Sequence, residues 1–537
     1  MNAQTVPGRL LELAEQDAAW PLLRHRDGLL SREEVIQRAS GVAAQLRDHG
    51  VTAGDPVVIM LPNSEEFVLS WFGVALAGAV QVPVNPDEVG PRLVHLFNHS
   101  RVAVAIVADE CLPALESVLA ELTCLTIVLV PSPASFSLGG LAVGRLDTRS
   151  ESDQVPDSAL VVEIHDPTAV MYTSGSTGPA KGVVLSNGHH LTNGRQPARL
   201  FDLGPSDIVY LCLPLHHNMA QGYGVMAALA SGASVAIDRR FQAAEFLDAV
   251  RHFGATVFPF VGAMLALIAK QPEREDDAQN PLRVGYGIPI PDGLHRATEA
   301  RFGLTLAHCY GSTEATIVSW MHREPRVFGS AGTVLPEYQV MIADSDDQPV
   351  SAGEVGQICV RPRDPFTMFS GYYRDPQRTV DSWRNLWFHT GDRGRFDEAD
   401  NLWFVDRMGD GIRRLGEFIS SYEVEQVLNA HPDIQIAAVL AVPSELIEEE
   451  VMAMIVPRPG VRLDPQDVRT YCARKLPRHA VPRYVHVRAS LPMTATGKVE
   501  KYRLKAEGVP IDADDARIHA DDHDRGNAFP VESRERV

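Results

Sequence analysis

Hydrophobic and polar positions along the first hundred residues follow two alternating patterns. Residues 30–50 and 66–77 place apolar side chains at helical spacing, and the first of these segments ends at a glycine. Continuous apolar runs at 57–61, 80–84 and 102–107 predict buried strands. Strands that alternate with helices pair in parallel through right-handed crossovers, so this part of the chain is predicted to form an α/β domain.

The alternation continues further along the chain, interrupted by a polar, Ser/Asp-rich connection at 131–157. The segments that extend it are 125–130, 208–214, 227–237, 255–260, 283–290 and 305–310. From 329 to 361 the pattern changes to short strands and glycine turns. This change predicts a small β-barrel-like lobe attached to the parallel αβ sheets.

A second, smaller domain is predicted after two glycines that flank an aspartate, in the run Met408-Gly409-Asp410-Gly411. Such a run after a strand is typical of a hinge, here placed at Gly409. Beyond it, helical and strand patterns predict a mobile α+β domain, at 424–429, 436–442, 451–456 and 468–475. The predicted organisation is an N-terminal domain over 1–406, a hinge over 407–411, a C-terminal domain over 412–505, and an acidic tail over 506–537 that is expected to be disordered.

Charge and composition narrow the range of partners. The 537 residues include 49 Lys and Arg against 69 Asp and Glu, a net charge of −20, which argues against nucleic acid and anionic membranes. No run approaches the ~20 apolar residues of a membrane span, and the N-terminus does not read as a secretory signal. The six cysteines form no C-x-x-C pair, which fits a reducing compartment and gives no metal site. A cytoplasmic monomer or homodimer is expected.

The stretch with the most distinctive chemistry is 172–183, which reads Y-T-S-G-S-T-G-P-A-K-G-V. Glycines let backbone N–H groups approach an anion, hydroxyl groups add donors, and Lys181 adds a point charge. These features predict a phosphate-binding loop; a Ser/Gly linker is the alternative, but it would rarely carry a lysine after so ordered a run. A Walker A loop is excluded because Gly182, not Ser or Thr, follows the lysine. Ser186 or Asn187 could cap the next helix.

Two acidic residues further along the chain can each be interpreted in two ways, as a functional residue or as a structural one. Glu314 ends the run Y-G-S-T-E and could bind Mg²⁺, or it could be a helix-start residue favoured by the dipole. Asp392, in T-G-D, could accept two ribose hydroxyl groups with Arg407 nearby, or it could be a turn aspartate paired with a surface arginine. Residue types alone leave both pairs of readings open.

The order of these motifs resembles the acyl-adenylate-forming superfamily, which includes acyl-CoA synthetases, adenylation domains of peptide synthetases and beetle luciferases. The matching motifs are the run 172–183, Y-G-S-T-E at 310–314, T-G-D at 390–392, Arg407, and L-P-M-T-A-T-G-K at 491–498. The resemblance covers residues 10–505. Within the superfamily, F-P-F-V-G-A-M at 258–264 is most similar to carnitine/crotonobetaine-type CoA ligases.

The resemblance implies a role for each motif. Lys498 is implied as the catalytic lysine that reaches the carboxylate and the α-phosphate, Glu314 as the Mg²⁺ ligand, and Thr173 as a second metal ligand. On composition alone, a lysine on a Thr/Gly turn would be read as solvated. The implied nucleotide- and CoA-binding residues are Thr173, Ser174, Gly175, Ser176, Thr177, Gly178, Lys181, Gly285, Gly287, Tyr310, Gly311, Ser312, Thr313, Asp392, Arg407 and Gly416.

His217 is implied as the residue that gates the acyl pocket. Zinc binding by His216 and His217 is disfavoured because adjacent side chains point apart and no third ligand lies near in sequence. The H-H-x-x-x-D-G motif of condensing acyltransferases is excluded because Gln221 stands where the aspartate is needed. A structural histidine remains the alternative. The candidate pocket walls are His217, Phe260, Val261, Gly262, Gly285 and Gly311.

Together these features predict a two-step ligase that uses ATP, Mg²⁺ and coenzyme A. A carboxylic acid, expected to be bulky, apolar and singly charged, would form an acyl-AMP and then a thioester. Three alternatives remain: a carrier-protein thiol as acceptor, an enzyme competent in one half-reaction, and a non-catalytic nucleotide-binding module. The departures Gly409, Leu415 and Phe418 from the family pattern leave the rate of the second half-reaction in question.

Overall fold

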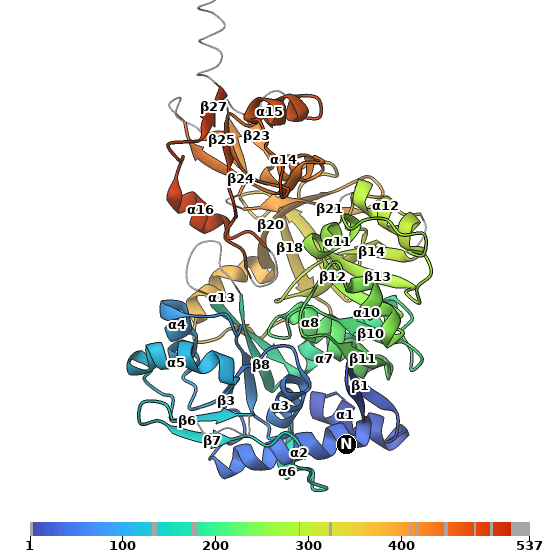
Figure 1. The fold of residues 1–537 in the computed structure, drawn as a ribbon, viewed down its shortest axis with the longest axis vertical. Coiled ribbons are helices and arrows are strands. Elements are labelled where there is room, and N and C mark those ends of the chain that lie inside the picture. The colour runs from blue at the N-terminus through green and yellow to red at the C-terminus, as the bar shows by residue number, and fades with distance from the viewer. Residues whose placement is uncertain are drawn as a thin grey trace, which may run out of the picture. The chain divides into compact units, whose positions relative to one another are not determined.

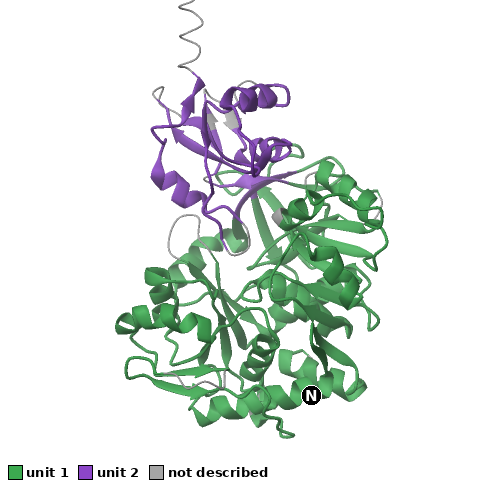
Figure 2. Ribbon diagram, in the orientation of Figure 1, with its two compact units in different colours: residues 1–354, 358–390, 396–403 green, residues 355–357, 391–395, 404–537 purple. Residues whose placement is uncertain are grey.

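The computed structural model divides the chain into two compact units (Figure 2). It describes residues 4–131, 137–173, 180–288, 290, 292–321, 325–408, 410–414, 417–444, 449–476, 480–494 and 498–516. Unit 1 comprises residues 1–354, 358–390 and 396–403, and unit 2 comprises residues 355–357, 391–395 and 404–537. The hinge residue predicted from the sequence, Gly409, lies outside the described residues.

One sheet of unit 1 has eight strands in the order β19-β9-β8-β4-β3-β5-β6-β7 (Figure 1). Its strands are β3 (Pro56–Met60), β4 (Val80–Pro83), β5 (Val104–Val107), β6 (Ile127–Val130), β7 (Ala142–Arg145), β8 (Pro167–Thr173), β9 (Lys181–Ser186) and β19 (Gly371–Tyr372). Strands β3 to β8 pair in parallel, whereas β9 runs antiparallel to both β8 and β19. Buried Val and Ile side chains on both faces explain the continuous apolar runs.

The other large sheet of unit 1 has nine strands in the order β16-β15-β14-β13-β12-β10-β11-β1-β2. Its strands are β1 (Pro21–His25), β2 (Gly28–Ser31), β10 (Ile208–Leu211), β11 (Ser234–Ile237), β12 (Val257–Val261), β13 (Val284–Ile288), β14 (Thr305–Ser312), β15 (Thr316–Met321) and β16 (Thr333–Val334). Its centre, β10 to β14, is parallel. The predicted α/β class is therefore confirmed.

Local signals explain where the helices of unit 1 begin. Ser31 caps α2 with a reciprocal bond to Glu34, and Ser64 and Ser186 cap α3 and α7. The helices are α1 (Val6–Gln16), α2 (Arg32–Asp48), α3 (Glu65–Leu76), α4 (Gly90–Ser100), η1 (Asp109–Cys111), α5 (Leu112–Val118), η2 (Leu119–Glu121), α6 (Asp157–Val161), α7 (Asn187–Leu200), α8 (Asn218–Ala220), η3 (Gln221–Met226), α9 (Ala227–Ser231), α10 (Phe246–Phe253), α11 (Gly262–Ala269), α12 (Asp292–Phe302), α13 (Pro376–Ser382) and η4 (Arg384–Leu386).

Short strands form the lobe expected after residue 329. They make a four-stranded sheet in the order β17-β18-β20-β21. The strands are β17 (Tyr338–Ala343), β18 (Gly356–Pro362), β20 (Phe388–Phe396) and β21 (Leu402–Arg407). Along β20 and β21 the chain passes from one unit to the other.

The described residues of unit 2 form a four-stranded sheet, a short hairpin and three helices. Its elements are β22 (Ile412–Arg414), β23 (Glu417–Ile419), α14 (Ser421–Asn429), β24 (Ile434–Pro443), β25 (Glu449–Pro457), α15 (Pro465–Ala473), β26 (Tyr484–Val487), α16 (Lys501–Glu507) and β27 (Asp514–Asp515). The sheet order is β24-β25-β26-β27, with β24 and β25 antiparallel. Buried apolar residues of α14, β24 and β25 form its core, which agrees with the predicted α+β character.

Two details of the sequence-based prediction are wrong. The polar connection at 131–157 contains strand β7, which pairs with β6. The limit of the C-terminal domain at 505 is too early, because β27 pairs with β26 and belongs to the sheet. The acidic composition of β27 was misleading: Asp515 accepts hydrogen bonds from the buried Arg483 at 2.9 and 2.8 Å, so these charges are paired. Among the described residues, no helix is both long and apolar enough to cross a bilayer.

Candidate active site

The phosphate-loop segment connects two antiparallel strands of the eight-stranded sheet. Tyr172 faces Gly182, and Thr173 faces Lys181, in the last pairs of the β8–β9 ladder. The sequence therefore folds into a hairpin whose ends are fixed by the ladder. The predicted nucleotide-binding residues Ser174, Gly175, Ser176, Thr177 and Gly178 lie outside the described residues.

Lys181, Glu314 and Tyr372 meet beside this hairpin, although they lie far apart in sequence. The ammonium nitrogen of Lys181 is 2.8 Å from Glu314 Oε1 and 2.9 Å from the Tyr372 hydroxyl. Tyr372 also donates to Glu314 Oε1 at 3.0 Å. Burial opposes ionisation of Glu314, but the charge and hydrogen bond of Lys181 outweigh it and lower the pKa of the carboxyl group. The site thus holds a buried carboxylate against a half-buried cation.

Tyr372 is a residue of this cluster that the sequence analysis missed. It belongs to β19, whose pairing with β9 places Tyr372 opposite Val183. Its contact with Lys181 depends on that pairing between distant segments. The only local signal was an aromatic pair after a glycine, in F-S-G-Y-Y at 369–373.

Thr173 carries a polar group suited to a bound ion or phosphate. Its hydroxyl oxygen is buried and has no hydrogen-bond partner among the described residues. An unsatisfied buried hydroxyl is costly unless a ligand or water completes it. Thr173 therefore fits the predicted ligand role, which remains a prediction.

The Y-G-S-T-E run lies at the turn between β14 and β15. Gly311 is required there, since a Cβ atom at this position would lie 1.9 Å from the carbonyl oxygen of Thr316. Ser312 Oγ accepts a hydrogen bond from the Ala315 amide at 3.3 Å, and Thr313 is partly exposed. Tyr310 is buried, with 6% of its surface exposed. The turn brings Glu314 to Lys181, whereas the nucleotide contacts expected of the other four residues remain predictions.

Gly285 and Gly287 allow the neighbouring strand β12 to pack closely against β13. A Cβ atom on Gly285 would lie 2.5 Å from the Phe258 ring, and one on Gly287 would lie 2.0 Å from the Phe260 carbonyl oxygen. The volume that these glycines leave is therefore filled, and the expectation that Gly285 opens a roomy acyl pocket needs correction. Tyr286 points to the other face, where it stacks on Phe201 with centroids 4.4 Å apart.

The residues predicted to line the acyl pocket follow the ends of β10 and β12. His217 is the residue directly before α8 and is partly exposed. Phe260 is fully buried, and Val261 is 9% exposed. Gly262 starts α11 directly after them. The rings of His216 and His217 lie with centroids 4.3 Å apart, so the assumption that they point apart was wrong. Burial and His217 lower the pKa of His216 well below its usual range, which keeps it neutral.

The predicted ribose and lysine residues lie together within unit 2. Arg407 Nε is 3.4 Å from Asp392 Oδ1, across the fifteen residues that separate them in sequence. Taken over all its atoms, Lys498 is exposed, although its ammonium group is desolvated. Desolvation of its ammonium group and the Arg407 guanidinium lower the pKa of Lys498 to about 8, whereas Asp392 opposes this change. The CoA-binding candidate Gly416 and the departure Leu415 lie outside the described residues, as does the side chain of Phe418.

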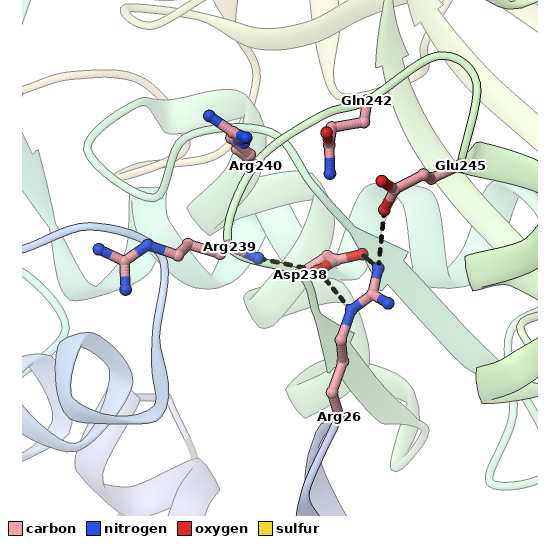
Figure 3. Close-up of a pocket in the computed structure, with 6 residues that line it drawn as sticks. All are labelled: Arg26, Asp238, Arg239, Arg240, Gln242 and Glu245. Atoms are coloured by element: carbon pink, nitrogen blue, oxygen red, sulfur yellow. Dashed lines mark hydrogen bonds and ion pairs between the residues drawn. The ribbon is translucent and has the colours of Figure 1, made fainter.

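A pocket in unit 1, shown in Figure 3, is separate from these residues. Arg26 donates two hydrogen bonds to Asp238, at 3.1 and 2.8 Å, and lies 3.7 Å from Glu245. The full lining is Arg26, Asp238, Arg239, Arg240, Gln242 and Glu245. None of these six residues was a site candidate from the sequence.

Comparison with known proteins agrees with this geometry. The AMP-binding enzyme family model matches residues 12–373, and the AMP-binding enzyme C-terminal domain matches residues 423–498. A crotonobetaine/carnitine–CoA ligase of Salmonella choleraesuis (strain SC-B67) is 30% identical over 484 residues, which cover 88% of this chain and 92% of that protein. The chain belongs to the AMP-binding enzyme family, the AMP-forming ligases of the acyl-adenylate-forming superfamily.

Solved structures share the fold over nearly the whole length. The anthranilate CoA ligase AuaEII in complex with anthranoyl-AMP superposes with a TM-score of 0.84 at 23% identity, covering 96% of this chain and 98% of that one. A benzoate CoA ligase from Burkholderia xenovorans LB400 gives a TM-score of 0.81 at 20% identity, covering 93% and 99%. These similarities support the two-part architecture described above.

Proposed function

We propose that this protein activates a carboxylic acid with ATP and transfers the acyl group to coenzyme A. The observation that carries the proposal is the meeting of Lys181, Glu314 and Tyr372 at the base of the phosphate-loop hairpin. The acid would attack the α-phosphorus of ATP to give acyl-AMP and pyrophosphate. The thiol of coenzyme A would then displace AMP and form the thioester.

The Lys181–Glu314 pair suits an exchange of partners when nucleotide binds. Without nucleotide, each charge compensates the other at 2.8 Å, which a buried carboxylate requires. In the complex, Lys181 would turn to phosphate oxygens, while Glu314, with Thr173, would hold Mg²⁺. A bound Mg²⁺ ion would neutralise phosphate charge, and it takes carboxylate and hydroxyl oxygens of this kind. Tyr372 would keep the Glu314 carboxylate oriented in both arrangements.

Separate sequence motifs would bind the ribose and the adenine of ATP. Asp392 and Arg407 would receive the ribose hydroxyl groups, and Tyr310 with the Gly285–Gly287 segment would lie along the adenine. Ser312, Thr313 and the segment 174–178 would contact the phosphates. Lys498 would supply positive charge to the pentacoordinate phosphorus, where negative charge develops during adenylation.

The acid is proposed to be a bulky, apolar monocarboxylate. His217, Phe260 and Val261 offer no fixed positive partner for a second carboxylate, and His216 beside them is held neutral. The relatives named as benzoate and anthranilate CoA ligases support an aromatic acid, whereas the crotonobetaine/carnitine–CoA ligase favours a second candidate, an acid that carries a quaternary ammonium group.

A panel of acids tests the function and the substrate class together. With MgATP and CoA, aromatic and branched acids should give AMP and acyl-CoA, both detected by mass spectrometry. A betaine acid in the same panel tests the second candidate, and acetate and malonate should react poorly. Preference for acetate or malonate would contradict the substrate proposal, and absence of AMP with every acid would contradict the function. Parallel reactions with a pantetheinylated carrier protein test the alternative acceptor.

Glu314→Gln should weaken the use of Mg²⁺ while the turn keeps its shape. Glutamine is nearly isosteric with glutamate but carries no charge, so it loses the negative charge that would hold Mg²⁺ and that pairs with Lys181. We expect adenylation at low Mg²⁺ to fall by roughly tenfold, the scale of one charged hydrogen bond, and the defect to shrink as Mg²⁺ rises. The measurement is pyrophosphate exchange against Mg²⁺ at fixed ATP.

Glu245→Gln provides the matched control for this experiment, since Glu245 lines the separate pocket and is largely exposed. It should behave as the unaltered protein at every Mg²⁺ concentration. Normal activity of Glu314→Gln at low Mg²⁺ would mean that Glu314 serves only the turn.

A further inference from the structure

Two histidines on one face of helix α4 contact the chain on both sides of the segment 174–179. His95 and His99 are four residues apart, so they lie one above the other on the helix. Their ring centroids are 5.2 Å apart. Neither residue belongs to a motif that the sequence analysis connected with function.

His95 holds the chain just after this segment. Its Nε2 atom lies 2.9 Å from the carbonyl oxygen of Ala180. Because a carbonyl oxygen can only accept, Nε2 carries the proton and donates. The pairing of Lys181 with Thr173 is the last of the β8–β9 ladder. Ala180 is the residue before Lys181 in the chain, so it lies outside the ladder, on the side of the loop. The histidine therefore extends the fixed part of the hairpin by one residue.

His99 holds the chain just before the same segment. Its Nδ1 atom lies 2.7 Å from the hydroxyl oxygen of Tyr172, and the two rings meet edge to face with centroids 5.7 Å apart. Burial and His95 lower the pKa of His99, and burial raises the pKa of Tyr172. Both groups are thus neutral, and the imidazole and the tyrosine hydroxyl share one hydrogen bond.

A second tyrosine completes the attachment of this helix to the hairpin. Tyr373 packs edge to face against His99, with centroids 6.0 Å apart. Its amide donates to the Gly182 carbonyl at 2.7 Å, and its hydroxyl donates to the Ser100 carbonyl at 3.4 Å. The strand β9, the segment after β19 and the end of α4 are therefore joined around one histidine.

Packing of α4 itself does not depend on these histidines. The apolar side chains Leu93, Leu96 and Phe97 are 0%, 3% and 1% exposed and anchor the helix in the core of unit 1. His95 and His99 are only partly buried. Their hydrogen bonds consequently serve the position of the hairpin more than the stability of the helix.

We propose that His95 and His99 are positioning residues for nucleotide binding, because they fix Tyr172 and Ala180, the chain neighbours of the ligand candidates Thr173 and Lys181, to one helix. Fixing these neighbours in advance lowers the ordering cost that binding would otherwise carry. The proposal rests on the proposed function, in which Lys181 binds the phosphates of ATP and Thr173 helps to hold Mg²⁺.

Paired variants test the hydrogen bonds directly. His99→Phe and Tyr172→Phe each remove one side of the same bond and keep an aromatic ring, so the double variant should cost no more than either single one. We expect each to raise the Kd of MgATP, measured by calorimetry, and the KM for ATP in adenylation by roughly threefold to tenfold. The rate of thioester formation from synthetic acyl-AMP should stay unchanged.

His95 has its own pair of variants. His95→Gln can still donate to the Ala180 carbonyl and should restore most of the affinity, whereas His95→Leu cannot donate and should raise the Kd of MgATP in the same range. Asn98→Ala is the matched control: Asn98 also lies on α4, but its side chain bonds the backbone of Glu121 and Thr123. It should leave the Kd of MgATP unchanged.

The outcomes separate this proposal from the proposed function. Unaltered MgATP affinity in His99→Phe and His95→Leu would overturn the positioning role, as would an equal loss in Asn98→Ala. An equal loss in the thioester-forming step, or a fall in thermal unfolding temperature that matches the loss, would assign the histidines to stability and overturn it too. If the unaltered protein bound no MgATP, both the proposed function and this inference would fall.

Discussion

Lys498→Ala is expected to lower acyl-adenylate formation by ~10²–10³, the range for the loss of one preorganised donor to developing charge. Thioester formation from synthetic acyl-AMP should remain near the rate of the unaltered protein, since that step has no pentacoordinate phosphorus to stabilise. The expectation follows from the position of Lys498 in L-P-M-T-A-T-G-K and from its place beside Asp392 and Arg407 in unit 2. The two half-reactions are measured separately, by pyrophosphate exchange and by release of AMP from acyl-AMP with CoA.

Lys475→Ala is a suitable control, because Lys475 is an exposed lysine of the same unit that lies over the Tyr471 ring. It should leave both half-reactions unchanged. Equal loss of both half-reactions in Lys498→Ala would contradict the assignment, because a residue needed only for phosphorus chemistry cannot slow a thiol attack on a preformed acyl-AMP.

The pH dependence of adenylation provides a second measure of the same residue. The pKa of Lys498 is lowered to about 8, by desolvation first and by Arg407 second. The charged form that the mechanism needs is thus present below this pH and is lost as the pH rises through about 8. Adenylation should decline above pH 8, and Lys498→Arg, whose guanidinium stays charged, should remove the decline from whatever activity it retains. An unchanged profile in that variant would assign the decline to another group.

Much of the fold could be predicted because its signals are local. The apolar runs of β3, β4 and β5 are buried on both faces of a parallel sheet, and such strands need no alternating pattern. Ser186 was expected to cap a helix, and its hydroxyl accepts from the His189 amide at the start of α7. The Asp392–Arg407 pair was also expected, and the turn between β20 and β21 brings the two side chains together.

The missed features depend on contacts between distant segments. Tyr372 reaches Glu314 only because β19 pairs with β9, and His99 reaches Tyr172 only because α4 packs beside β8. Neither residue stands in a motif with a fixed spacing to its partner. At the acidic end of unit 2 the local signal itself was misleading. Its composition indicates disorder, but Arg483 and Arg469 form ion pairs with its aspartates within the fold.

The histidine pair at the start of α7 should make the protein sensitive to acid. His189 and His190 are fully buried, and no ring nitrogen of either has a hydrogen-bond partner among the described residues. His190 stacks on Trp71, with centroids 5.2 Å apart. Burial lowers the pKa of each histidine to about 3, and for His189 the neighbouring His190 adds to this effect. The folded state therefore keeps both imidazoles neutral.

The sign of the effect follows from the unfolded chain, in which histidine has a pKa of about 6.5. Above that pH neither state binds the protons, so these residues add no pH dependence. As the pH falls below it, the unfolded chain gains protons that the folded protein excludes, and at pH 5 this costs about 2 kcal/mol of stability per histidine. Urea unfolding midpoints should therefore drop steeply between pH 7 and pH 5.

Variants at the two positions isolate their contribution to this loss. His190→Phe keeps a ring against Trp71 and removes the titrating group, and combined with His189→Asn it should flatten the dependence of the midpoint on pH. The control His165→Asn changes a half-exposed histidine and should keep the steep slope. If the double variant loses as much stability between pH 7 and pH 5 as the unaltered protein does, the acid sensitivity arises elsewhere. Equal midpoints at pH 7 and pH 5 in the unaltered protein would contradict the prediction, because they would mean that the folded protein protonates the buried pair at no cost.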